Sequence, residues 1–216
     1  MGQKVNPKSI RLKINEMWTS SWFGRQNYVE TLISDLKIRK IIDKKLKDAY
    51  VSKVEIDRDA NKLTINIHSS RPGVIIGRGG AGTEDLKKLI ATKAKEKIQI
   101  NIIEVKKPDA DAAIIASGIA NQLERRIPYR RAIKQAIEKA KAAGILGIKV
   151  MIGGRLNGAD IARSEKISFG SVPLSTFKSD IDYKYTTALT TFGIIGIKVW
   201  VYKGERVYTS EDFGKN

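Results

Sequence analysis

The fold is decided by a glycine-rich stretch in the first half of the chain, Arg71-Pro72-Gly73-Val74-Ile75-Ile76-Gly77-Arg78-Gly79-Gly80-Ala81-Gly82. Within it, Gly77 and Gly80 let the main chain approach a phosphate, because neither carries a Cβ. From Thr83 the sequence is typical of a helix with an acidic first turn, and the free N–H groups of such a helix start favour an anion. The stretch therefore predicts a phosphate-binding loop in which Arg78 adds a charged contact.

The residues on either side of this loop predict the order helix, strand, strand, loop, helix, strand. A helix is expected over residues 27–50, where apolar side chains recur at helical spacing: Leu32, Ile33, Leu36, Ile38, Ile41, Ile42 and Leu46. Alternating residues predict strands at 51–56 and 63–67, joined by a turn near 59–61, and a further strand at 98–105.

A G-x-x-G loop in this order is the arrangement of a type II KH domain (αββααβ), a module that binds RNA. We therefore expect RNA to contact the loop residues Gly77, Arg78, Gly79 and Gly80. We expect a neighbouring groove for unstacked bases to be walled by three apolar residues, Val74, Ile75 and Ile76.

The same glycines allow a second interpretation. Gly77 to Gly82 also satisfy G-x-G-x-x-G, the pattern of a dinucleotide-binding loop, and Glu104 follows at a suitable distance for a ribose contact. That fold needs repeated βαβ units, however, and here two consecutive helices are expected further along the chain. Pro72 also breaks the strand that would have to lead into the loop. We therefore favour the RNA-binding interpretation.

Composition points to the same class of partner. The chain has 216 residues, a formal net charge of +17 and a pI near 9.9, which favours nucleic acid first and an anionic membrane second. There is no cysteine and only one histidine, so we expect no disulfide, no thiolate nucleophile, no metal site and no cofactor. No apolar run approaches the length of a membrane span. These features are typical of a soluble protein of a reducing compartment.

The second half predicts an α+β domain. Beyond a boundary at 106–109, helices are expected at 111–126 and 128–143, and strands at 148–152, 161–169, 183–191 and 195–202. We expect two helices on a four-stranded, mainly antiparallel sheet. The predicted organisation is a basic arm at residues 1–26, a KH domain at 27–107 and the α+β domain at 108–216. The arm is expected to lack order without RNA.

The second predicted helix of this domain carries a basic face. On a helical wheel, Arg130, Arg131, Lys134 and Lys141 lie on one side, interrupted by Glu138, and alanine and isoleucine occupy the other. A run of charge is often only a solvated surface. Arginine at the head of the run favours RNA instead, because its guanidinium suits phosphate and stacks on bases.

Taken together, the chain resembles the S-three family of bacterial small-subunit ribosomal proteins. The matching segments run from end to end: Met1-Gly2-Gln3-Lys4-Val5-Asn6-Pro7, Lys37-Ile38-Arg39, Arg71-Pro72-Gly73, Gln122-Leu123-Glu124-Arg125-Arg126, Arg130-Arg131-Ala132, Gly154-Arg155-Leu156, Val172-Pro173-Leu174, Asp180-Ile181-Asp182-Tyr183 and Gly196-Ile197-Lys198-Val199-Trp200. Each segment is short, and their joint order is specific. A free-standing KH regulator of messages is the competing binding module, and the second domain counts against it.

The resemblance implies a structural ribosomal protein and not an enzyme. It implies binding to 16S-class ribosomal RNA in the head of the small subunit, beside ribosomal proteins S-ten and S-fourteen. It also implies a place, with S-four and S-five, at the channel by which mRNA enters, on a cytoplasmic ribosome or, alternatively, an organellar one. Residues expected at the mRNA entry are Arg126, Arg130, Arg131 and Lys134, and the resemblance implies that the last three help unwind mRNA.

Further residues are expected to bind RNA, four of them in the N-terminal arm: Lys4, Lys8, Arg11, Lys13 and Arg71. The chain departs from the family at one point of the loop. Family members commonly have two basic residues between the glycines, whereas here Arg78 is followed by Gly79.

Overall fold

The fold is taken from a computed structural model, which describes residues 4–24, 27–59, 62–92 and 97–205. The chain divides into two compact units, one of Trp18–Lys106 and one of Met1–Met17 with Lys107–Asn216. None of the described helices is long and apolar enough to cross a membrane. The helices are α1 (Tyr28–Lys45), α2 (Pro72–Ile76), α3 (Ala81–Ala91), α4 (Ala112–Glu124) and α5 (Tyr129–Ala142). The strands are β1 (Ser20–Ser21), β2 (Val51–Arg58), β3 (Lys62–Ser69), β4 (Lys97–Glu104), β5 (Gly147–Gly154), β6 (Arg163–Gly170), β7 (Ser179–Thr190) and β8 (Gly193–Glu205).

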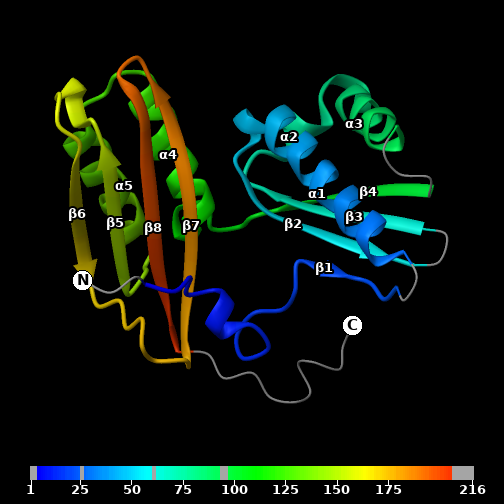
Figure 1. The fold of residues 1–216 in the computed structure, drawn as a ribbon, viewed down its shortest axis with the longest axis horizontal. Coiled ribbons are helices and arrows are strands. Elements are labelled where there is room, and N and C mark those ends of the chain that lie inside the picture. Colours follow the sequence, from blue (N-terminus) through cyan, green and yellow to red (C-terminus); the bar gives the residue numbers. More distant parts are fainter. Residues whose placement is uncertain (1–3, 25–26, 60–61, 93–96, 206–216) are drawn as a thin grey trace. The chain divides into compact units, whose positions relative to one another are not determined.

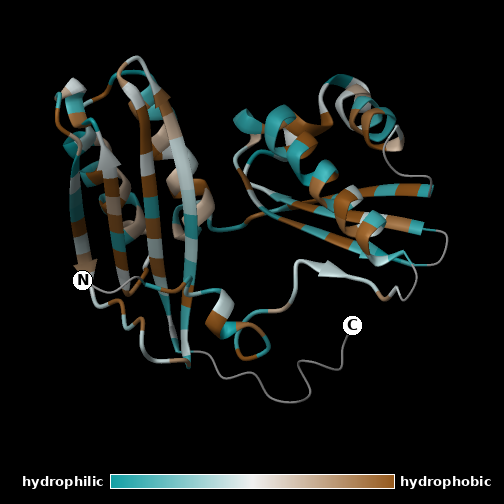
Figure 2. Cartoon of the chain, in the orientation of Figure 1, coloured by the Kyte–Doolittle hydropathy of each residue, from teal (hydrophilic) through white to brown (hydrophobic). Residues whose placement is uncertain are grey.

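The unit of residues 18–106 has the predicted αββααβ order, α1-β2-β3-α2-α3-β4 (Figure 1). Its sheet runs β1-β2-β3-β4, with β2 antiparallel to β3 and β4 parallel to β3. Strand residues alternate between apolar and polar, visible as alternating bands in Figure 2. Of the apolar set, Ile56, Leu63 and Ile65 are fully buried against the helices, whereas Ile98, Ile100 and Ile102 of β4 are partly buried. The predicted fold class is confirmed for this half.

Helix α1 differs from the expectation in which of its sides is buried. Ile38, Ile42 and Leu46 lie in the core as predicted, whereas Leu32, Ile33 and Leu36 are 39%, 44% and 52% exposed. The inward position one turn before Ile38 is taken by Asp35, which is buried. Its Oδ1 accepts from Arg58 Nη2 of β2 at 2.6 Å, and its Oδ2 accepts from Trp22 Nε1 at 2.9 Å. Helical spacing placed all the apolar residues of this helix on one face. In the structure the buried Asp35–Arg58 ion pair occupies part of that face, so Leu32, Ile33 and Leu36 remain partly exposed.

The other unit is a two-layer α+β structure, as predicted. Its sheet runs β6-β5-β8-β7, and all three pairings are antiparallel. Helices α4 and α5 cover one face and lie behind the sheet in Figure 1. Ile148, Val150 and Ile152 of β5 and Ile197 and Val199 of β8 point into this layer and are fully buried. Alternate residues of these strands point to the opposite face, on which no helix of the described residues packs.

The N-terminal segment is folded onto this second unit instead of being a separate arm. Arg11 is 1% exposed, and its guanidinium donates to four backbone oxygens: Pro7 at 3.1 Å, Leu174 at 3.0 Å, Thr176 at 2.8 Å and Ser179 at 2.8 Å. A buried guanidinium must satisfy its donors within the protein, and here carbonyl groups do so. These contacts attach the segment of residues 4–17 to the second unit.

Candidate nucleic-acid interfaces

The glycine loop connects two helices through backbone conformations that suit glycine. Helix α2 ends at Ile76, and Gly77 follows with φ 69° and ψ −173°. Gly79 and Gly80 have φ 61° and 86°, and α3 then begins at Ala81. A Cβ on Gly82 would overlap the carbonyl oxygen of Ile75, so the two helices approach closely at this point. The loop is thus followed directly by a helix N-terminus, the predicted setting for an anion.

This geometry does not fit the dinucleotide interpretation. The loop is preceded by helix α2, not by a strand. The strands β3 and β4 on either side of it are parallel, but the described strands form no repeat of such a unit, because the second sheet is antiparallel throughout. A dinucleotide loop needs a strand leading into it.

The side chains beside the loop divide between core and surface. Val74 and Ile76 are 54% and 42% exposed, as a groove wall requires, but Ile75 is 1% exposed and belongs to the core. The predicted groove wall is corrected accordingly to Val74 and Ile76, because Ile75 occupies the inward position of the α2 turn. Arg78 is exposed. Arg71 is exposed too, with its guanidinium carbon 4.8 Å from the ring centroid of Tyr50.

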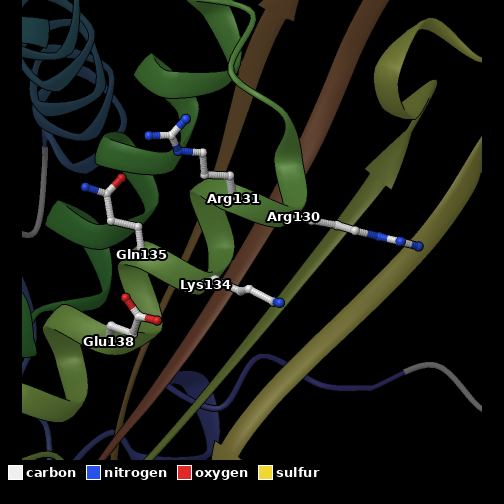
Figure 3. Close-up of a pocket in the computed structure, with 5 residues that line it drawn as sticks. All are labelled: Arg130, Arg131, Lys134, Gln135 and Glu138. Atoms are coloured by element: carbon white, nitrogen blue, oxygen red, sulfur yellow. The ribbon is translucent and has the colours of Figure 1, made fainter.

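The predicted basic face of α5 is on the surface, and its apolar face is in the core. Ala132, Ile133 and Ala140 are fully buried, whereas the predicted RNA contacts Arg130, Arg131 and Lys134 are exposed. A depression runs between these three, Gln135 and Glu138. In Figure 3, Arg131, Gln135 and Glu138 point to one side of the helix, and Arg130 and Lys134 point to the other. The face is therefore two rows of side chains flanking a shallow hollow.

One of these arginines is held by a carboxylate that the sequence did not indicate. Arg130 Nη2 lies 3.3 Å from Glu165 Oε1 of β6, and the same oxygen accepts from Tyr129 Oη at 2.7 Å. The Tyr129 hydrogen bond, followed by Arg130, lowers the pKa of Glu165. Within the described part of the chain, Arg131 and Lys134 have no carboxylate at ion-pair distance, so their charge faces solvent.

Arg126 lies just past the end of α4 with φ 63°, a left-handed conformation that is uncommon outside glycine. It is exposed and lines a cavity of about 400 Å³ together with Tyr129, Arg155 and Phe192. The loop between α4 and α5 thus brings Arg126 next to the start of the basic helix.

The basic residues of the N-terminal segment have different positions. Lys4 and Lys13 are exposed. Lys8 Nζ lies 2.8 Å from Asp182 Oδ1, so Lys8 already forms an ion pair within the protein. Arg11, predicted to bind RNA, is buried and bonded to the protein's own carbonyls, which corrects its role to a structural one. Sequence composition does not distinguish an arginine that binds RNA from one that anchors a segment.

Comparison with known proteins covers both units. A family described as "KH domain" matches residues 37–110, and one described as "Ribosomal protein S3, C-terminal domain" matches residues 119–201. The small ribosomal subunit protein uS3 of Lactobacillus delbrueckii subsp. bulgaricus is 54% identical over 95% of this chain and 92% of its own length. That of Enterococcus faecalis is 50% identical over 100% of this chain and 99% of its own. The chain belongs to the uS3 family.

The uS3 family is the S-three family of the sequence analysis, so the predicted resemblance is confirmed. Its members are structural constituents of the small ribosomal subunit and not enzymes. They bind RNA and work in translation on the cytoplasmic bacterial ribosome. No cluster of three or more His, Asp or Glu side chains placed to hold a metal ion occurs among the described residues.

A set of lysines on the strands of the second unit was not predicted from the sequence. Lys149, Lys166 and Lys198 lie on the sheet face opposite α4 and α5, at alternate positions to core residues. The sequence carried a signal for two of them, since Lys149 and Lys198 each fall between two apolar residues of a strand, whereas Lys166 lies between Glu165 and Ile167. Their convergence on one face depends on strand pairing.

Proposed function

We propose that, as a uS3-family constituent of the small subunit, the chain binds ribosomal RNA through its KH loop and acts on mRNA with α5. The observation that carries the mRNA role is the exposed face of α5, where Arg130 has an acidic partner and Arg131 and Lys134 have none among the described residues. The alanine side of α5 packs on the core, so the helix holds these cations in fixed positions. Separating paired mRNA strands needs such a fixed surface. Arg126 extends this face.

Ribosomal RNA binding rests on the loop of residues 77–80. Its glycines bring the backbone to the surface beside the start of α3, and Arg78 is free to contact phosphate. Arg71, Lys4, Lys8 and Lys13 are the further contacts that we propose, and Lys8 must exchange Asp182 for phosphate to take part. Arg11 is left out because it is buried.

We also propose the location and neighbours that the resemblance implies. The chain lies in the head of the small subunit on 16S-class RNA, next to ribosomal proteins S-ten and S-fourteen. At the channel by which mRNA enters, S-four and S-five are its neighbours. The proposed domain limits remain 27–107 and 108–216, with residues 4–17 belonging structurally to the latter unit.

The mRNA role is tested by the triple variant Arg130→Ala, Arg131→Ala and Lys134→Ala in cells that depend on it. Initiation on reporters with a stable hairpin near the start site should fall several-fold, while unstructured reporters are translated as before. Lys139→Ala, at an exposed position of the same helix outside the basic face, is the control. Equal translation of both reporters by the triple variant overturns the assignment. Gradient sedimentation of the variant with the small subunit shows that assembly is intact.

A further inference from the structure

The sheet of the second unit has a second face, made of three cross-strand rows, on which no helix of the described residues packs. In strand order β6, β5, β8 and β7, the rows are Ser164, Gly153, Gly196 and Thr187; Lys166, Met151, Lys198 and Tyr185; and Ser168, Lys149, Trp200 and Tyr183. Helices α4 and α5 occupy the other side, behind the sheet in Figure 1. The third row is largely covered, since Trp200 is 8% exposed and belongs to a small cluster with Val172 and Leu174. The first two rows are open.

Tyr185 forms a platform on this open area. It is 50% exposed, and Gly196 is its diagonal neighbour on β8, where it pairs with Thr187. A Cβ built on Gly196 would lie 3.3 Å from Cε2 of the Tyr185 ring. The ring therefore leans across the strand over a glycine, where a larger residue would push it away. An aromatic ring held in this way on a sheet offers a surface for stacking a base.

The charge around the platform has one sign. Lys198 is the cross-strand partner of Tyr185, and Lys166 lies in the same row. The twelve residues of the three rows include no acid. Burial, and then repulsion from Lys4 and Lys166, lowers the pKa of Lys149. Positive charges therefore lie close enough to repel one another here, and no acid of the three rows offsets them. An anion bound here would relieve that repulsion.

We propose that this open sheet face is a third RNA surface, which binds a single-stranded segment with one base stacked on Tyr185 and phosphates on Lys166 and Lys198. It is separate from the KH loop and from the α5 face and uses none of their residues. RNA suits the face better than a protein does, because lysine is depleted at protein interfaces and the apolar cluster around Trp200 is already covered by this chain. Stacking on aromatics with flanking cations is how proteins hold single strands.

The test uses the full chain in a background that removes the KH-loop arginine and the α5 cations, with Arg78→Ser, Arg130→Ala, Arg131→Ala and Lys134→Ala. Binding of a short fluorescein-labelled oligouridine, which cannot pair with itself, is followed by anisotropy. Residual binding should weaken about tenfold with Tyr185→Ser and persist with Tyr185→Phe, since stacking needs the ring and not its hydroxyl. Lys166→Gln with Lys198→Gln should lower the salt slope by about 1.4. Lys184→Gln is the matched control, because this lysine neighbours Tyr185 on the strand but faces the other side.

Each outcome decides the proposal separately from the proposed function. If the background variant binds no oligouridine, or if Tyr185→Ser binds as well as Tyr185→Phe, the sheet face is not an RNA site, and the KH loop and α5 assignments stand. Crosslinking of the unmodified chain with a 4-thiouridine oligomer guards against misfolded variants. Crosslinks in the β7 peptide that contains Tyr185 support the proposal. Crosslinks confined to the KH loop and α5, as expected if a protein covers the face, overturn it.

Discussion

At the scale of single residues, Gly77 has a backbone conformation that residues with a side chain rarely adopt. At φ 69° and ψ −173° an L side chain is strained, and a Cβ would lie 3.2 Å from the backbone nitrogen of Gly82. We expect Gly77→Ala to destabilise the α2–α3 region by about 2 kcal/mol. Hydrogen exchange of amides in residues 72–91 measures this. Gly73→Ala, four residues earlier with open space around its Cβ, should be neutral or stabilising. Equal protection in the two variants contradicts the argument.

Glu165 is a second residue whose effect is local. It holds Arg130 at 3.3 Å and places a negative charge beside the basic face. Because exposed ion pairs are weak, we expect Glu165→Gln to raise the affinity of this face for an RNA hairpin by about threefold. Anisotropy titration at low salt measures it. In an Arg130→Ala background the gain should disappear, and an undiminished gain there would show that Glu165 acts on RNA directly and not through Arg130.

At the scale of elements, α1 is attached to its sheet by polar as well as apolar contacts. Asp35 and Arg58 have side chains only 3% and 7% exposed, and Trp22 donates to the same carboxylate. Asp35→Ala would leave the Arg58 guanidinium buried without its carboxylate partner, so we expect the free energy of unfolding to fall by about 3–5 kcal/mol. Urea unfolding combined with hydrogen exchange of α1 measures it. Asp43→Ala, at an exposed position of the same helix, should change the free energy of unfolding little. An equal fall in both variants would mean that the experiment reports helix propensity and not the buried ion pair.

At the scale of the whole molecule, an ion-pair cluster attaches the N-terminal segment to the second unit. Asp182 pairs with Lys8 at 2.8 Å and Lys203 at 3.6 Å and accepts from the Ala112 backbone N–H at 2.9 Å. Burial alone would raise the pKa of Asp182, but the two lysines and these hydrogen bonds outweigh it and lower the pKa. One residue thus joins α4, β7, β8 and the chain start.

The sign of this shift predicts how stability depends on pH. With a pKa lower in the folded than in the unfolded chain, Asp182 stabilises fully above the unfolded value of about 3.9, and the contribution is lost as pH falls below about 4. Melting temperatures from pH 7 to 3 should fall more steeply for the native chain than for Asp182→Asn, which starts lower. Asp160→Asn, fully exposed, is the control. Parallel curves for Asp182→Asn and the native chain would refute this linkage.

Much of the architecture follows from local pattern. Alternation in β2, β3, β5 and β8 and the glycine loop led to the correct fold class, because strand faces and tight turns depend on neighbours in sequence. The buried and exposed sides of α5 were predicted for the same reason. Pattern failed at α1, where a buried aspartate takes a position that spacing assigns to leucine. Its partner Arg58 lies 23 residues away, beyond any local signal.

The sequence by itself determined the family, the order of elements, the RNA-binding class of partner and the exposed cations of α5, all of which follow from residue types and short spacings. Only the tertiary structure decided which cations remain available. It buried Arg11 among backbone carbonyls, paired Lys8 with Asp182 and Arg130 with Glu165, and gathered Lys149, Lys166 and Lys198 on one sheet face. The physical reason is that a charge is neutralised or left free by neighbours that strand pairing and packing bring together from distant parts of the chain.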